Sequence, residues 1–144
     1  EIIGLAAGIH DIGKTEKKIS KAIAGTRKLS PRKRIRMENH VPEGLKIINN
    51  IWNSHQTPGQ KMVSKVVGSH HEHYNGTGYP NRIRGSKIPI GGRILAIADF
   101  YCALTEDRSY RKGMPKKKVI KIMQKESGVR LDPKLVKEFI KFIE

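Results

Sequence analysis

Four sequence-distant stretches of this 144-residue chain carry imidazole and carboxylate side chains of the kind that bind metal ions. They are His10-Asp11, His40, His70-His71 and Asp99. Similar gaps separate them, each about long enough for one helical segment, so a helical fold could bring all six side chains to one point. A metal centre is therefore the first hypothesis.

The ligand types also limit which metal ions could bind and which reaction they could support. Imidazole and carboxylate without thiolate disfavour a structural zinc site and suit iron or manganese. Six ligands would leave a single ion no open position for a substrate, whereas two adjacent ions bridged by Asp11 would use them all. Such a pair lowers the pKa of a water molecule from about 15.7 toward about 7, which gives a nucleophile at neutral pH.

Each of these residues also has a purely structural explanation. An aspartate at a helix end is often a cap, and a core histidine is usually hydrogen-bonded to backbone. Asp99 lies within the apolar segment 94–100, where we expect it to be withdrawn from water. Because an uncompensated buried carboxylate is costly, a cation should sit beside it. Cys102, three residues after Asp99 on the same expected helix, is expected to be a core residue.

The elements that would position these residues are helices joined by short loops. Helices are expected from the chain start to about Gly13, from Ser30-Pro31 toward Asn39, from Pro42 onward, from Met62 to Ser69, from Arg93 to Thr105, and after Met114-Pro115 and Asp132-Pro133. Residues 75–92 hold five glycines and two prolines, which indicates an irregular loop. No segment alternates as a half-buried strand would, so the sequence predicts a single all-α domain over residues 1–144.

Composition restricts the partners. The net charge of +16, from 29 Lys and Arg against 13 Asp and Glu, favours an anionic partner. Aromatic residues are not interleaved with the basic runs, so we expect no polynucleotide binding. No apolar run approaches the roughly 20 residues that cross a bilayer, so no membrane contact is expected. A single cysteine suits a reducing cytoplasm.

Several motifs together resemble one known family. They are His10-Asp11-Ile12-Gly13-Lys14, His40 with Gly44, His70-His71-Glu72, Asn75-Gly76-Thr77-Gly78-Tyr79-Pro80, Ile88-Pro89, and Asp107-Arg108-Ser109-Tyr110-Arg111. This set is similar to the HD-GYP family of HD-domain phosphohydrolases, in the family's order and over nearly the whole chain. An HD pair alone is weak evidence, but the combination is highly specific.

The resemblance implies an HD-type helical bundle that hydrolyses cyclic di-GMP to pGpG and, in some members, onward to GMP. It implies two or three ions, usually iron or manganese, held by His10, Asp11, His40, His70, His71 and Asp99, with Asp11 bridging. Lys14 would contact the scissile phosphate, and Arg108 and Arg111 would bind phosphate oxygens. Tyr79 would line the nucleotide pocket, in a loop associated with contacts to GGDEF partner domains.

Some alternatives stay open at this point. Arg108 and Arg111 would share a helix face if the preceding helix continues, and salt bridges with Glu106 or Asp107 are their structural alternative. The domain is expected to be truncated at its N-terminus, without the upstream helix that carries a further metal-binding histidine in the family and without any sensor domain. Two other function classes remain: a noncatalytic module that binds a cyclic dinucleotide or a GGDEF partner, and a phosphohydrolase for another nucleotide or a hybrid cyclic dinucleotide. A homodimer is an open alternative to a monomer.

Overall fold

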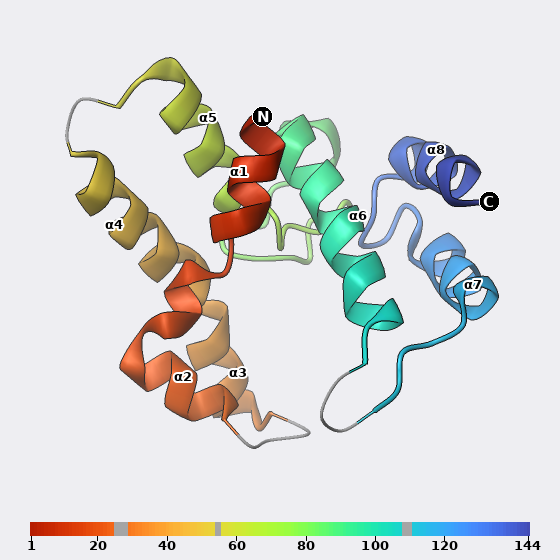
Figure 1. Ribbon diagram of the computed structural model, residues 1–144, viewed down its shortest axis with the longest axis horizontal. Coiled ribbons are helices and arrows are strands. Elements are labelled where there is room, and N and C mark those ends of the chain that lie inside the picture. Colours follow the sequence, from red (N-terminus) through yellow and green to blue (C-terminus); the bar gives the residue numbers. More distant parts are fainter. Residues whose placement is uncertain (25–28, 54–55, 108–110) are drawn as a thin grey trace. The chain divides into compact units, whose positions relative to one another are not determined.

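The computed structural model describes residues 1–24, 29–53, 56–107 and 111–144. Over these ranges the chain forms helices and irregular loops, without a β-strand beyond isolated bridges such as that between Ser127 and Leu131. The residues group into two compact units, Glu1–His70 and His71–Glu144 (Figure 1). The all-α fold class is confirmed.

The first unit contains five α-helices and one short 3-10 helix in its described residues. Helix α1 (Ile2–Ile9) packs against α5 (Pro58–Val67), and η1 (Ile12–Thr15) packs against α4 (His40–Trp52). Helix α2 (Lys17–Ile23) lies beside α3 (Pro31–Glu38) (Figure 1). The buried apolar side chains that hold these helices together are Ala6, Ile19, Ala22, Val41, Ile48, Val63, Val66 and Val67.

Local sequence signals explain where several helices begin. The Ser30 side chain accepts a hydrogen bond from a backbone N–H in the first turn of α3, and Pro31 occupies the first helical position. Thr57 and Gln60 form a reciprocal capping box at the start of α5. The Asp132 side chain accepts hydrogen bonds from the backbone N–H groups of Lys134 and Leu135 in the first turn of α8. The helix starts expected at Ser30-Pro31 and Asp132-Pro133 are therefore confirmed.

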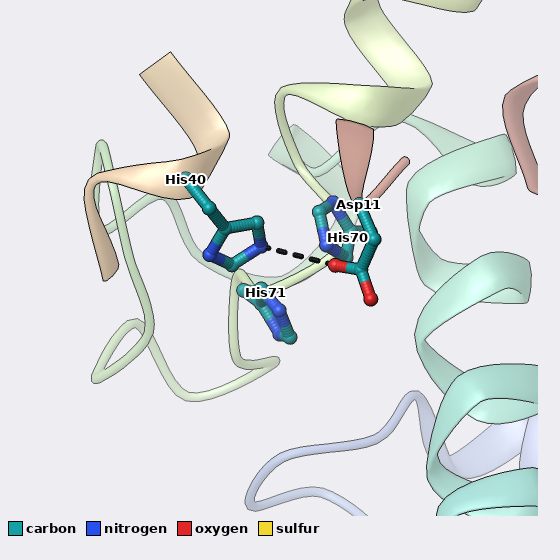
Figure 2. A group of neighbouring side chains, drawn as sticks. All are labelled: Asp11, His40, His70 and His71. Atoms are coloured by element: carbon teal, nitrogen blue, oxygen red, sulfur yellow. Dashed lines mark ion pairs between the residues drawn. The ribbon is translucent and has the colours of Figure 1, made fainter. Parts of the chain in front are cut away.

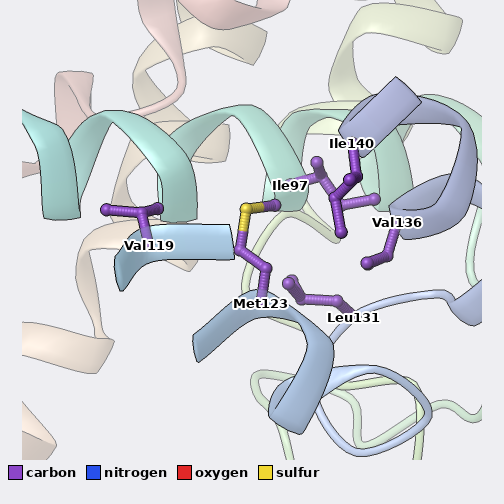
Figure 3. Packing of buried hydrophobic residues seen from close by; sticks show 6 residues of the cluster. All are labelled: Ile97, Val119, Met123, Leu131, Val136 and Ile140. Carbon is purple, nitrogen blue, oxygen red and sulfur yellow. The ribbon is translucent and has the colours of Figure 1, made fainter. Parts of the chain in front are cut away.

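The second unit is built on helices α6 (Ile90–Thr105), α7 (Lys116–Glu126) and α8 (Pro133–Ile143), with a short 3-10 helix η2 (Gly85–Lys87) in the preceding loop. Helix α6 packs against both α7 and α8. Figure 3 shows the buried apolar cluster that joins them, which consists of Ile97, Val119, Met123, Leu131, Val136 and Ile140. Fully buried side chains of this kind stabilise a fold by about 1.5–3 kcal/mol each.

Some expected helix boundaries were wrong. Helix α4 begins at His40, so Pro42 lies inside its first turn, where a missing N–H breaks no intrahelical hydrogen bond. Helix α5 begins at Pro58 rather than Met62. Helix α2 was not expected at all, because its lysine-rich sequence offers only Ile19 and Ala22 to the interior.

The expected burial of α6 was also partly wrong. Asp99 is half-buried instead of being withdrawn from water, and Cys102 is exposed instead of lying in the core. The buried residues of α6 are Gly91, Gly92, Leu95 and Ile97. Most residues of the helix are apolar, so its sequence does not reveal which side is buried.

No helix within the described ranges combines the length and the apolar character that crossing a membrane requires.

Candidate metal centre

Side chains from separate elements of the first unit meet at one point. They are Asp11, His40 and His70, and His71 is joined to this group by its peptide bond to His70 (Figure 2). One ligand atom from each of the four lies within 4.8 Å of the others. His10 lies against the same group, because its Nε2 atom is 3.4 Å from Asp11 Oδ2 and its ring centroid is 5.0 Å from that of His70. The structure thus brings five of the six expected ligands together.

Three of these histidines follow the C-terminal ends of helices. His10 directly follows α1, His40 lies two residues beyond α3, and His70 lies three residues beyond α5. In each case Nδ1 contacts the backbone carbonyl three residues earlier, at 2.7 Å for Ala7, 2.7 Å for Met37 and 2.6 Å for Val67. These carbonyls lie in last helical turns, where carbonyl groups lack an intrahelical donor and carry partial negative charge. Three helix ends therefore orient the imidazoles and favour a cation nearby.

This hydrogen bonding fixes the tautomer of the histidines. A carbonyl oxygen only accepts, so Nδ1 must carry the hydrogen and Nε2 keeps the lone pair in the neutral ring. Burial lowers the pKa of His70 to about 4 and also lowers the pKa of His40 below 6.5. Both rings are neutral at pH 7. A neutral imidazole whose other nitrogen donates to a backbone carbonyl is the usual form of a metal-ligating histidine.

The carboxylate of Asp11 supplies the negative charge. Burial raises its pKa, but the hydrogen bond and charge of Lys14, with smaller effects of His10 and His40, lower the pKa below 3.8. Oδ2 lies 2.5 Å from Lys14 Nζ. Oδ1 is buried and accepts no hydrogen bond from the described residues, although His40 Nε2 lies 3.3 Å away (dashed line in Figure 2). Because both of these atoms are acceptors at neutral pH, a cation between them would satisfy both, and the residues fit a divalent metal ion.

A close approach of two glycines sets the position of Asp11. A Cβ atom on Gly13 would lie 2.0 Å from the carbonyl oxygen of His40 and 2.6 Å from the backbone nitrogen of Gly44. Only glycine therefore lets η1 lie directly on the first turns of α4. This contact brings Asp11, two residues before Gly13, to His40. It gives a physical reason for the pairing of His10-Asp11-Ile12-Gly13-Lys14 with His40 and Gly44.

The loop that follows His71 carries Tyr79. The rings of His71 and Tyr79 lie 4.8 Å apart at a tilt of 30°, and the Tyr79 backbone N–H donates to the His71 carbonyl at 3.1 Å. Gly78 permits this turn, since a Cβ there would be 2.2 Å from the backbone nitrogen of His73. Tyr79 is thus held against a residue of the metal-ion group.

Glu72 is a residue whose role sequence reasoning missed. It is only 2% exposed, and its two carboxylate oxygens accept backbone hydrogen bonds from Asn81 at 2.7 Å and Ile83 at 3.1 Å. A buried carboxylate is tolerated when donors surround it in this way. Glu72 therefore anchors the far side of the loop that carries Tyr79. The available signal was a charged residue placed directly after two histidines.

Three further expected site residues belong to the second unit or lie outside the described residues. Asp99 is on α6 in the second unit, and its role as a ligand stays a prediction. Arg111 donates to the backbone carbonyls of Ala103 and Leu104 near the end of α6, the latter at 3.2 Å. The helix that would have placed Arg108 and Arg111 on one face ends at Thr105. Arg108 itself lies outside the described residues.

Comparison with known proteins gives consistent matches. The sequence model of a family described as HD domain matches residues 2–135. The chain is 33% identical over 136 residues to the 3'3'-cGAMP-specific phosphodiesterase 2 of Vibrio cholerae serotype O1, a match that covers 94% of this chain and 25% of that protein. It is 30% identical over 141 residues to a cyclic di-GMP phosphodiesterase of the same organism, covering 97% of this chain and 28% of the relative.

A cyclic di-GMP phosphodiesterase of Thermotoga maritima is 29% identical over 139 residues, a match that covers 96% of this chain and 36% of the relative. The chain therefore spans between a quarter and just over a third of the length of these relatives. The resemblance that the motifs indicated is confirmed.

Proposed function

Because this chain belongs to the HD domain family, we propose that it is a metal-dependent phosphodiesterase that hydrolyses cyclic di-GMP to pGpG, with GMP as a further product. The observation that carries the proposal is the group formed by Asp11, His40 and His70. It combines a carboxylate with two imidazoles whose Nδ1 atoms lie within hydrogen-bonding distance of backbone carbonyls. Relatives named as cyclic di-GMP phosphodiesterases, matched over most of this chain, support the choice of substrate.

In this proposal the metal ions are two or three in number, and iron or manganese in kind. The ligands would be His10, Asp11, His40, His70, His71 and Asp99, with Asp11 bridging. When bound, the ions supply the Lewis acidity that makes water a nucleophile at neutral pH and the positive charge that the transition state requires.

The side chains of this chain would orient the metal ions and the substrate and stabilise the charge of the transition state. Asp11 faces His40 with Oδ1 and Lys14 with Oδ2, so one carboxylate can serve two neighbouring sites. Lys14 holds its ammonium group where charge develops on the scissile phosphate and stabilises that charge. Tyr79, held against His71, lines the nucleotide pocket. Arg108 and Arg111 bind phosphate oxygens, which requires Arg111 to exchange its carbonyl contacts for the substrate.

A second candidate is hydrolysis of the hybrid cyclic dinucleotide 3'3'-cGAMP. The observation that favours it is the 33% identity to a phosphodiesterase named as specific for that compound. The two substrates differ in one base, so the pocket around Tyr79 would decide between them. A noncatalytic binding module and a phosphohydrolase for another nucleotide are the remaining alternatives.

Three broader expectations belong to the same proposal. Both compact units form one domain, which the family match across residues 2–135 supports. The protein acts in the cytoplasm. A GGDEF-domain protein and a second copy of this chain stay candidate partners.

The test is to purify the protein anaerobically, load it separately with iron and manganese, and measure bound metal and the products from cyclic di-GMP and 3'3'-cGAMP by chromatography. We expect about two ions per chain and pGpG as the first product. Asp11→Asn keeps the shape of the side chain but removes its charge, so metal binding and turnover should both be lost. Glu138→Gln, an equivalent change at an exposed position of α8, should alter neither.

Each other outcome has a definite meaning. Turnover of 3'3'-cGAMP alone supports the second candidate. A metal-loaded protein that binds a cyclic dinucleotide without cleaving it overturns the enzyme proposal and supports the noncatalytic module.

A further inference from the structure

The first unit contains a pocket of about 630 Å³ where α2, α3 and α4 approach one another. Its lining includes Glu16, two residues after Lys14, and Asn39, directly before His40. Lys14 and His40 both belong to the metal centre, so two stretches of backbone run from that centre to the pocket lining within one or two residues. A volume of this size is typical of small-molecule sites.

Three cationic side chains line the pocket: Lys18 and Lys21 from α2, and Arg36 from α3. All three are exposed to solvent, and across the described residues none of them forms an ion pair. An exposed cation without an anionic neighbour is available to an anionic ligand, and an arginine can bind a phosphate group with two parallel hydrogen bonds. The pocket therefore has the charge and the size for a phosphate ester.

The two carboxylates in the pocket lining already have hydrogen-bond donors. Glu16 Oε2 accepts hydrogen bonds from the backbone N–H groups of Lys18 at 2.8 Å and Ile19 at 3.0 Å, because it caps α2. Glu43 Oε1 lies 2.7 Å from Lys46 Nζ. Glu16 is thus held by backbone N–H groups and Glu43 by an ammonium group outside the lining, so neither carboxylate is an ion-pair partner of the three pocket cations, which outnumber the carboxylates.

We propose that Lys18, Lys21 and Arg36 bind the second phosphate of a cyclic dinucleotide while its first phosphate occupies the metal centre. The inference rests on the proposed function and adds to it a determinant of substrate specificity. A cyclic dinucleotide carries two phosphodiester groups, and ring closure keeps their separation nearly constant. A phosphate site beside the metal centre therefore favours such a ligand over a substrate with one phosphodiester.

The test compares two substrates in the metal-loaded protein: cyclic di-GMP, which has two phosphodiesters, and bis(p-nitrophenyl) phosphate, which has one. In Arg36→Gln and Lys18→Gln the KM for cyclic di-GMP should rise about tenfold, as expected for one lost hydrogen bond to a charged group. The kcat for cyclic di-GMP, and the kcat/KM for bis(p-nitrophenyl) phosphate, should change less than about twofold, because neither side chain contacts the reacting phosphate.

The chain offers matched controls on the same two helices. Arg34 on α3 and Lys17 on α2 are exposed and carry the same charge, but they do not line the pocket. Arg34→Gln and Lys17→Gln therefore remove a charge without removing a pocket contact. They should leave the KM for both substrates within about twofold, which separates a local contact from the general effect of net charge.

The outcomes distinguish this inference from the proposed function. If the protein cleaves cyclic di-GMP and Arg36→Gln raises KM no more than Arg34→Gln, the pocket does not bind the second phosphate and the inference is overturned. If the protein cleaves bis(p-nitrophenyl) phosphate but no cyclic dinucleotide, the proposed function itself fails, and this inference with it.

Discussion

The two compact units bury different kinds of side chain. In the first unit, His40 and His70 are fully or almost fully buried. In the second, the cluster around Met123 is apolar throughout (Figure 3). An apolar side chain gains free energy directly on leaving water, whereas a buried imidazole needs partners for its nitrogens. The first unit therefore buries imidazoles whose polar contacts a bound metal ion would complete, whereas the second combines its apolar cluster with two buried carboxylates, Glu72 and Asp132, that have donors of their own.

The stability of the two units is therefore expected to respond differently to metal binding. Metal binding favours the folded state when the ligands converge only after folding. The predictions that follow use this contrast, from the largest expected effect to the smallest.

The largest effect is expected from Gly13→Ala. The added Cβ would meet the backbone of α4, which cannot move without displacing His40. We expect a loss of about 3 kcal/mol or more in the free energy of unfolding, together with loss of bound metal. Gly4→Ala is the control, because a Cβ there meets nothing within 4 Å and alanine favours a helix. Equal effects of both changes in denaturant unfolding would contradict the close-approach argument.

Met123→Ala should lower the stability of the second unit without removing a metal ligand. Met123 is fully buried, so its truncation should cost about 2–5 kcal/mol. The protein that remains folded should keep its full metal content, because no residue of the metal centre belongs to this cluster. Phe142, which is 86% exposed, provides a control of comparable size, and Phe142→Ala should cost less than about 0.5 kcal/mol. Loss of bound metal from folded Met123→Ala protein would contradict the expectation that metal binding does not depend on this apolar cluster.

Removal of the metal ions should lower the stability of the first unit more than that of the second. A ligand present at about 100 times its Kd stabilises a fold by about 2.7 kcal/mol, and a chelator should remove that amount. Hydrogen exchange should then rise at amides of α4 and α5, while amides of α7 and α8 stay protected. Uniform loss of protection along the chain would show that metal binding does not distinguish the units.

The smallest effect concerns acid and the ion pair of Asp132 in the second unit. Burial raises the pKa of Asp132, but the Arg93 hydrogen bond at 2.6 Å and two backbone N–H groups of α8 outweigh it and hold the pKa below 3.8. The folded-state pKa is thus lower than the unfolded one. This stabilisation is complete above about pH 4 and is lost as pH falls through the folded-state value.

The change Asp132→Asn tests this ion pair. Asparagine caps a helix nearly as well as aspartate, so the change should cost about 1.5–3 kcal/mol at pH 7, mainly through the lost charged hydrogen bond to Arg93. The difference from the unchanged protein should shrink toward pH 3, as measured by denaturant unfolding at both pH values. Glu138→Gln, at an exposed position, should show no such trend. A difference that stays constant with pH would contradict the assignment.

Much of the fold and the metal site could be predicted because the relevant signals are local. The caps Ser30 and Asp132 mark helix starts by hydrogen bonds within one turn, and they were identified correctly. Helix α2 was missed because two apolar residues in seven are too few for a clear period. The start of α4 was misplaced because proline is tolerated throughout a first turn.

The sequence alone determined the all-α class, the four stretches that carry potential ligands and the family motifs, since these depend on residue type and short-range periodicity. The tertiary structure decided the rest. The contact of Gly13 with α4 brings Asp11 to His40, and the packing of α6 leaves Asp99 partly in water. Both facts depend on which element, remote in sequence, packs against each face of a helix. The sequence of the helix alone does not specify that packing partner.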